Sequence, residues 1–458
     1  MIGHTPVLHE YNELNSLCLL LPTSMTSNSM KSNSVCPHSS LTFTPSEFSS
    51  TTGFSWSDDK KRAAAVTPQG RAPVNPSIPN PPTFPAPLVL PDDDLALDPS
   101  YPAQSLRSWI RSKDRNPITE ERRIIYVAEP PSVDPDIDAV SQWSSPKVPK
   151  DSRVSEPRTQ EVIDYLTAFY HGTAVKKLPI RLVFTSWDTP PKTESQKNSN
   201  IGLIVGTECV RIRARRGFGD LFLRQLNLDD LLDAAISLVP NDAYALLLLV
   251  SHDIYEHEED DFACGRAYGG SRVAVVSTAR YNPGLDLAQN IDREHSWPAS
   301  HCSAYIQSCC ADAKTSGRLK GRKISNTDTE KQETGYPGPM HAALTAHLAR
   351  PATTNSEHTL SASSGLWLAR VCRTASHELG HCFGMDHCVY YACAMQGSAS
   401  LAEDARQPPY VCPVDLEKML QACSTTRDLR DEALLAFCER YKHVPHFSAF
   451  AAWIRGSQ

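Results

Sequence analysis

Residues 377–387 read HELGHCFGMDH, which is the pattern HExxHxxGxxH. No Pro or Gly interrupts the chain from Leu366 to His377, so the motif is expected to begin on a helix. Because positions i and i+4 share one face of a helix, the imidazoles of His377 and His381 can converge on one metal ion, with Glu378 beside it. Gly384 permits a positive φ, and the turn that follows would bring in His387 as a third ligand.

This set of donors predicts a catalytic metal centre. Three neutral imidazoles leave the fourth position of tetrahedral zinc open for water, whereas a structural site fills all four positions with protein ligands. Zinc would lower the pKa of that water and polarise a carbonyl group, and Glu378 would serve as general base, so the expected reaction is amide hydrolysis. An isolated HExxH match is usually an ordinary helix, but five fixed positions agree here, which favours the metal site.

Cysteines behind the motif predict a second metal site. Cys388 and Cys393 follow the third histidine closely, and the stretch Cys412-Pro413-Val414-Asp415 comes seventeen positions after Met395. Three thiolates and the carboxylate of Asp415 could complete a tetrahedral structural zinc site. Cys423 is an alternative fourth donor, and a disulfide between two of these cysteines is the alternative to zinc. A reducing compartment disfavours the disulfide, so zinc is the preferred interpretation.

Taken together, these elements resemble the archaemetzincins, a metzincin family of zinc metallopeptidases. The resemblance rests on HExxHxxGxxH followed directly by Cys388, then by Cys393, Met395-Gln396-Gly397-Ser398 and Cys412-Pro413-Val414. It is sharp over residues 366–420, looser over 180–282, and includes nothing before about residue 160. Met395 matches the methionine that lies beneath the metal in metzincins.

The resemblance implies an α/β fold: a compact metalloprotease domain with a mixed twisted sheet and an active-site helix. Composition predicts that a long disordered N-terminal region precedes this domain. It also implies one catalytic zinc on His377, His381 and His387, with Glu378 as base, and one structural zinc. The family's four cysteine ligands of that second ion fall on Cys388, Cys393, Cys412 and Asp415, so the carboxylate is a departure. Members resemble peptidases, some of them aminopeptidases.

Composition bears on partners and location. The 458 residues include 45 basic and 52 acidic side chains, a formal net charge of −7, so no general attraction to nucleic acid or to anionic lipid is expected. The N-terminus lacks a signal-peptide pattern, and no apolar run reaches transmembrane length. We therefore expect a soluble, monomeric protein of the cytoplasm that acts on a peptide or protein substrate. The basic run 318–323 leaves a nuclear location as a lesser alternative.

The distribution of residue types predicts the domain organisation. Ser, Thr, Pro and Asn dominate residues 1–100, which we interpret as a disordered tail, and a Pro-rich linker follows over 101–160. The metallopeptidase domain is expected over 161–440, with an irregular insertion at 283–362, and a C-terminal tail over 441–458. Periodicity predicts helices near 161–170 and 228–238, and strands near 180–184, 201–210, 245–250 and 273–277.

Three other interpretations remain open. His252 and His257 with the acidic run 256–261 could bind metal, although such a run is usually a solvated loop. Cys302, Cys309 and Cys310 with His301 could also bind metal, and this receives little weight. Finally, the chain could be a zinc-stabilised binding or scaffold protein that uses its N-terminal arm for partners and turns substrate over slowly or not at all.

Overall fold

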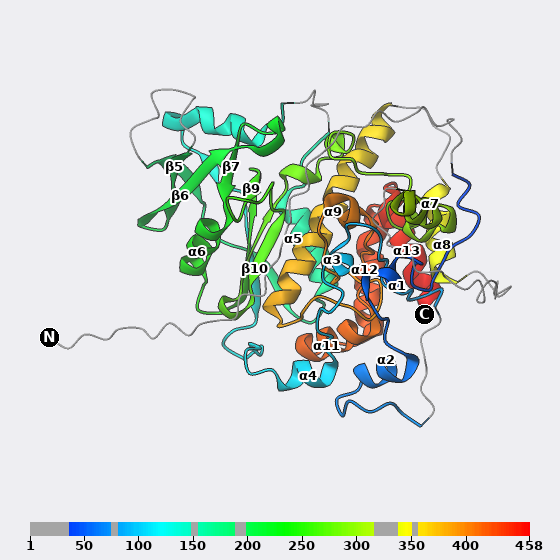
Figure 1. The fold of residues 1–458 in the computed structure, drawn as a ribbon. Helices are drawn as coiled ribbons and strands as arrows, with labels where there is room; N and C mark the ends of the chain where they lie inside the picture. The colour runs from blue at the N-terminus through cyan, green and yellow to red at the C-terminus, as the bar shows by residue number, and fades with distance from the viewer. Residues whose placement is uncertain (1–35, 75–80, 148–153, 188–197, 316–337, 350–355) are drawn as a thin grey trace.

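The computed structural model describes residues 36–74, 81–147, 154–187, 198–315, 338–349 and 356–458. A long central helix, α9 (Ser356–Cys382), separates the sheets from helices α7, α8 and α13 (Figure 1). The other α-helices in this part of the chain are α1 (Ser49–Thr52), α2 (Asp59–Ala65), α3 (Asp94–Leu97), α4 (Leu106–Arg111), α5 (Thr159–Phe169), α6 (Leu228–Leu238), α7 (Ser303–Thr315), α8 (Pro339–Leu348), α10 (Leu401–Arg406), α11 (Pro413–Cys423), α12 (Arg427–Arg440) and α13 (Pro445–Ser457). None of the described helices combines the length and the apolar character that a bilayer crossing needs.

The sheet beside α9 has the strand order β10-β11-β8-β1-β3. Its strands are β10 (Gly265–Tyr268), β11 (Val273–Ser277), β8 (Ala243–Val250), β1 (Ile124–Ala128) and β3 (Ala174–Lys177). All pairs are parallel except β10 with β11, which is antiparallel. The expected α/β class with a mixed sheet is confirmed, and the antiparallel strand β10 forms one edge.

Strand β8 shows why a continuous apolar run forms a central strand. All eight of its side chains are buried, because helices cover both faces of the sheet. Ala245, Leu247 and Leu249 belong to the core that contains α9, whereas Leu246 and Leu248 belong to the core beneath α6. The period-two alternation of a strand thus supplies both cores from one stretch of sequence.

A second sheet, with the order β2-β4-β5-β6-β7-β9, shares a hydrophobic core with α6 and strand β8. Its strands are β2 (Ser132–Val133), β4 (Val183–Ser186), β5 (Asn198–Val205), β6 (Glu208–Arg216), β7 (Arg224–Asn227) and β9 (Ile254–Tyr255). The single strand expected near 201–210 is in fact the hairpin β5–β6, because Gly206 at φ +61° turns the chain between the two. Helix α6 has the bounds that periodicity predicts.

The prediction of a disordered tail over residues 1–100 needs correction in its described part. Residues 36–74 and 81–100 carry helices α1 to α3, and Phe84, Val89, Leu90 and Leu95 are buried. The helices here are only four to seven residues long, but the apolar side chains between the prolines still bury against the folded domain. Residues 1–35 lie outside the described residues.

The expected linker over 101–160 is likewise part of the folded domain. It contains helix α4 and strand β1, and β1 pairs with β8 on one side and β3 on the other. Ile125 and Val127 of that strand are fully buried. The domain therefore begins well before residue 161, because an internal strand cannot be removed from a sheet without exposing its backbone groups.

The insertion and the C-terminal tail also differ from expectation. Residues 283–362 include helices α7 and α8, and α9 begins at Ser356. Residues 441–458 include helix α13, whose buried side chains Phe450 and Trp453 belong to the same core as Met340 of α8. Helix α8 could not be predicted from the sequence because its polar and apolar residues are not separated onto two faces. Its packing partner α13 also lies about a hundred residues away along the chain. The basic run 318–323 lies outside the described residues.

Candidate active site

The three histidines of the motif converge at the C-terminal end of α9. The ring centroids of His377 and His381 lie 4.7 Å apart, and that of His387 lies 5.3 Å and 5.1 Å from them respectively. The Nε2 atoms of His377 and His381 are 3.1 Å apart. Two nitrogens at about 2.0–2.1 Å from one tetrahedral zinc would lie roughly 3.3–3.4 Å apart, so the observed spacing fits a shared ion.

A sharp turn after the helix brings the third histidine back. Helix α9 ends at Cys382, and Gly384 adopts φ +74°, a conformation that favours glycine. The amide of Met385 then donates to the carbonyl of Gly380 at 3.1 Å, which closes the turn. A Cβ atom at Gly384 would also lie 3.1 Å from Cγ of Arg115, so a larger residue would have to displace that side chain in addition to adopting the positive φ.

Hydrogen bonds on the outer side of the rings fix their protonation. Nδ1 of His377 lies 2.8 Å from the carbonyl of Ala394, and Nδ1 of His381 lies 2.7 Å from that of Met385. A carbonyl only accepts, so each Nδ1 carries the proton and each Nε2 presents a lone pair to the centre. Burial lowers the pKa of His381 and of His387 to about 4 and lowers that of His377 well below its usual value, so the rings are neutral as metal ligands must be.

Glu378 lies beside this centre and faces strand β10. Its side chain is buried, and burial raises its pKa to about 8, although the nearby Arg373 and Arg266 act to lower it. A Cβ atom on Gly265 of β10 would come within 3.2 Å of Cγ of Glu378, so the missing side chain makes room for the glutamate. A carboxylate held here can exchange a proton with a group bound between the histidines and the strand.

Met395 packs against the helix from below. It is 1% exposed, and its carbonyl accepts a hydrogen bond from the amide of Cys388 at 2.8 Å. A Cβ atom on Gly380 would lie 2.4 Å from the Met395 sulfur, so this methionine occupies the space that the glycine leaves. The turn at Met395 therefore contacts the active-site helix at Gly380.

The second predicted cluster also comes together. Cys388 and Cys412 have their sulfurs 3.5 Å apart, and Oδ2 of Asp415 lies 3.3 Å from the sulfur of Cys393 and 3.4 Å from that of Cys412. All four residues are buried, and their donor atoms lie within 4.8 Å of one another. Four soft or anionic donors at such distances suit a closed tetrahedral zinc site.

Lys418 balances the charge of this cluster. Its Nζ donates to Oδ1 of Asp415 at 2.8 Å and to Oε1 of Gln104 at 2.8 Å, and the lysine is 1% exposed. Burial raises the pKa of Asp415 to about 6, helped by Cys388 and opposed by Lys418. Cys423, the alternative fourth donor, is not in the cluster: it ends α11 and lies against Gly172 instead.

Residues before 160 contact the turn between the second and third histidines, which sequence reasoning missed. The indole of Trp109 donates to the carbonyl of Phe383 at 2.9 Å, and the amide of Gln104 donates to that of Gly384 at 2.9 Å. The ring of Tyr101 lies 5.4 Å from that of His387. The aromatic residues within this Pro-rich stretch could have indicated the contact, because large aromatic side chains usually pack against a folded surface.

The other possible metal ligands predicted from the sequence do not form the groups that were considered. His252 is buried, and its Nε2 lies 3.2 Å from the carbonyl of Val140, which accounts for it as a core residue. His257 lies outside every metal-binding group found among the described residues. Cys309, Cys310 and His301 do not gather with one another in such a group, whereas Cys302 joins a different set, described below.

Comparison with known proteins fits this geometry. Residues 354–421, which span α9, both clusters and most of α11, match the family described as Peptidase family M54. Archaemetzincin-2 of Macaca fascicularis is 23% identical over 358 residues, which is 78% of this chain and 74% of that protein. The chain is similar to the archaemetzincins over most of its length. This similarity indicates a zinc metallopeptidase.

Two further archaemetzincins are similar to it. Archaemetzincin-2 of Homo sapiens is 26% identical over 215 residues, so the alignment spans about half the length of each protein. The crystal structure of archaemetzincin from Methanopyrus kandleri superposes with a TM-score of 0.30 at 17% identity, and the alignment covers 67% of this chain and 98% of that one.

Proposed function

We propose that this protein hydrolyses peptide bonds, with His377, His381 and His387 as ligands of a catalytic zinc and Glu378 as general base. The observation that carries the proposal is the convergence of three neutral imidazoles, two on α9 and one from the turn after it, beside the buried carboxylate of Glu378 on α9. Three protein donors leave one tetrahedral position for water or substrate, which distinguishes this cluster from a closed structural site.

The chain's own residues then move one proton. When bound, zinc would act as a Lewis acid toward the scissile carbonyl and would make water acidic near neutral pH. Glu378 accepts a proton from the attacking water as the water oxygen bonds to the carbonyl carbon. The same carboxyl group passes that proton to the amine nitrogen as the carbon–nitrogen bond breaks. A pKa raised by burial favours a carboxyl group that can hold the proton between these two steps.

Strand β10 offers a place for the peptide. It is one of the two edge strands of its sheet among the described residues, and a Cβ atom on its Gly265 would meet the side chain of Glu378. An extended peptide can add to such an edge through main-chain hydrogen bonds. A substrate aligned in this way would have its backbone next to the glutamate and the histidines. We infer that peptides are bound in extended form and that an aminopeptidase-like action would require a group that blocks the peptide beyond its N-terminal residue.

We propose a second, structural zinc at Cys388, Cys393, Cys412 and Asp415. It would tie the turn after the active-site helix to the start of α11, because the first two cysteines precede Met395 and the other two donors begin that helix. Four protein donors leave no position open for substrate. Since three of them must be thiolates, we place the protein in a reducing compartment, the cytoplasm or the nucleus, as a monomer.

The test is digestion of a mixed peptide library by the full-length zinc-loaded chain, read by mass spectrometry. Wild type should cleave, and Glu378→Gln should lose about 10²–10⁴-fold in rate while its zinc content stays the same. Glu417→Gln, a change at an exposed glutamate of α11, is the matched control and should leave cleavage unchanged. Removal of single N-terminal residues would identify aminopeptidase action, and internal cuts would identify an endopeptidase.

The alternative is a zinc-stabilised scaffold protein with little or no turnover. It predicts that wild type and Glu378→Gln are equally silent across the library although both hold zinc. Equal cleavage by the two proteins would instead remove Glu378 from the role of base. The intact Glu378 and the three neutral imidazoles support the peptidase over the scaffold.

A further inference from the structure

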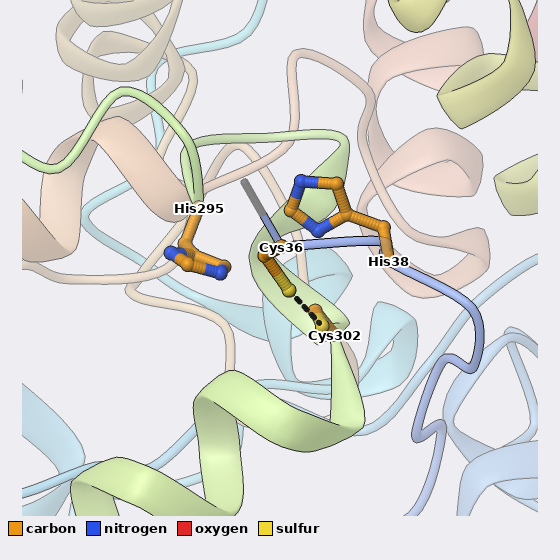
Figure 2. A group of neighbouring side chains, drawn as sticks. All are labelled: Cys36, His38, His295 and Cys302. Atoms are coloured by element: carbon orange, nitrogen blue, oxygen red, sulfur yellow. Dashed lines mark hydrogen bonds between the residues drawn. The ribbon is translucent and has the colours of Figure 1, made fainter. Parts of the chain in front are cut away.

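A third group of metal-binding side chains lies away from both clusters. We propose that Cys36, His38, His295 and Cys302 form a further structural zinc site. The four side chains gather where the N-terminal segment crosses the loop that leads into α7 (Figure 2). This inference does not depend on the proposed peptidase activity, because none of these residues belongs to the catalytic cluster.

The distances fit a tetrahedral ion. The four donor atoms lie within 4.8 Å of one another, and the sulfurs of Cys36 and Cys302 are 3.6 Å apart. Two sulfurs at about 2.3 Å from zinc would be about 3.8 Å apart, whereas a disulfide requires about 2.05 Å. The ring centroids of His38 and His295 lie 5.2 Å apart, close to the separations among the three catalytic histidines. The geometry therefore fits two thiolates and two imidazoles around one ion.

The two histidines have nitrogen atoms that nothing in the described structure satisfies. Nδ1 of His295 lies 2.7 Å from Oδ2 of Asp292, while its Nε2 is buried without a hydrogen-bond partner. Nδ1 of His38 is likewise buried without a partner, and the residue is only 7% exposed. Buried polar atoms normally have partners, so two orphaned imidazole nitrogens at one point indicate a missing ligand. A carboxylate on the outer nitrogen is also the usual support of a metal-binding histidine.

The surrounding backbone holds the donors in place. The amide of Thr42 donates to the carbonyl of His301 at 2.8 Å, and the amide of Ser303 donates to the carbonyl of Ser40 at 3.0 Å. The ring of Tyr305 stacks on His295 with centroids 4.3 Å apart. These contacts bring the N-terminal segment and the loop together before any ion binds, so the site requires little rearrangement.

Zinc is the metal that this set of donors favours. Two thiolates and two imidazoles form one of the standard structural zinc sets, and the two thiolate charges cancel those of the ion in a partly buried place. Binding releases the two thiol protons to solvent. The ion would fasten residues 36–42 to the loop 292–302, and so hold the N-terminal segment against the domain.

The experiment counts zinc in the intact full-length chain by native mass spectrometry. His295→Ala should hold one zinc fewer than wild type, whereas Cys309→Ser, at a nearby cysteine of α7 outside the group, should hold the same number. Because the comparison is a difference between two proteins, it stays valid whether or not peptides are cleaved. Equal zinc content in His295→Ala and wild type, or a Cys36–Cys302 disulfide in the wild-type mass, would overturn the proposal.

A second measurement covers the case in which that variant does not fold. Wild type is treated with iodoacetamide, and the labelled cysteines are located by peptide mapping. Cys36 should be protected while zinc is bound and labelled once a chelator is added, whereas the exposed Cys209 should be labelled in both states. Labelling of Cys36 as fast as Cys209 in the zinc-loaded protein would contradict the site.

Discussion

Asp415 provides the sharpest test of the second cluster, because its carboxylate has two roles. Oδ2 faces the sulfurs of Cys393 and Cys412, and Oδ1 pairs with Lys418, which is 1% exposed. Asp415→Ala removes one proposed zinc ligand and leaves a buried lysine without its carboxylate. Breaking a buried ion pair in this way costs about 3–5 kcal/mol. We expect the free energy of unfolding to fall by that amount in chelator, where zinc makes no contribution.

The assay is urea unfolding of wild type and variant, with and without chelator, together with a zinc count on each protein. Asp415→Ala should hold one zinc fewer than wild type, and Asp415→Cys, which supplies a fourth thiolate, should keep the full number. Cys423→Ala is the control for the alternative donor and should also keep it. A loss below about 1 kcal/mol with full zinc content in Asp415→Ala would refute the role given to this carboxylate.

Two further predictions concern residues outside the metal clusters. Trp109→Phe leaves the buried carbonyl of Phe383 without its donor, so urea unfolding should show a loss of about 1–3 kcal/mol, and a change below about 0.5 kcal/mol would contradict the contact. His252 has a pKa lowered to about 4 by burial, against 6.5 when unfolded, so the unfolded chain binds more protons between these values and stability falls as pH falls. Wild type should lose about 2 kcal/mol more free energy of unfolding between pH 7 and pH 5 than His252→Gln, whose amide can take the place of the ring beside the carbonyl of Val140. Identical pH profiles for the two proteins would exclude His252 as the cause.

The local sequence pattern predicted those helices and strands whose apolar residues recur at a regular spacing. The apolar run at 245–250 predicted a buried strand, and β8 is buried along its whole length. Spacing also placed His377 and His381 on one helical face, and the turn at Gly384 brings His387 to them. In each case a period of two or 3.6 residues, or one glycine, carries the information.

Contacts between distant segments could not be predicted in this way. Val89 and Leu90 lie among prolines, a composition typical of disorder, yet they are buried against parts of the chain far away in sequence. Cys36 and Cys302 are 266 residues apart and form no short spacing pattern, so neither suggested the other. The sequence also left Asp415 and Cys423 open as fourth donor, because both lie on α11 and only the direction of each side chain separates them.

The most direct test of the central claim is an anomalous difference map at the zinc absorption edge, from a crystal of the full-length protein. The account predicts a peak about 2.0–2.1 Å from the Nε2 atoms of His377, His381 and His387, on the side of the helix where Glu378 faces strand β10. If zinc-loaded crystals show no peak between these three imidazoles while other sites in the same map are occupied, the proposed catalytic centre is contradicted.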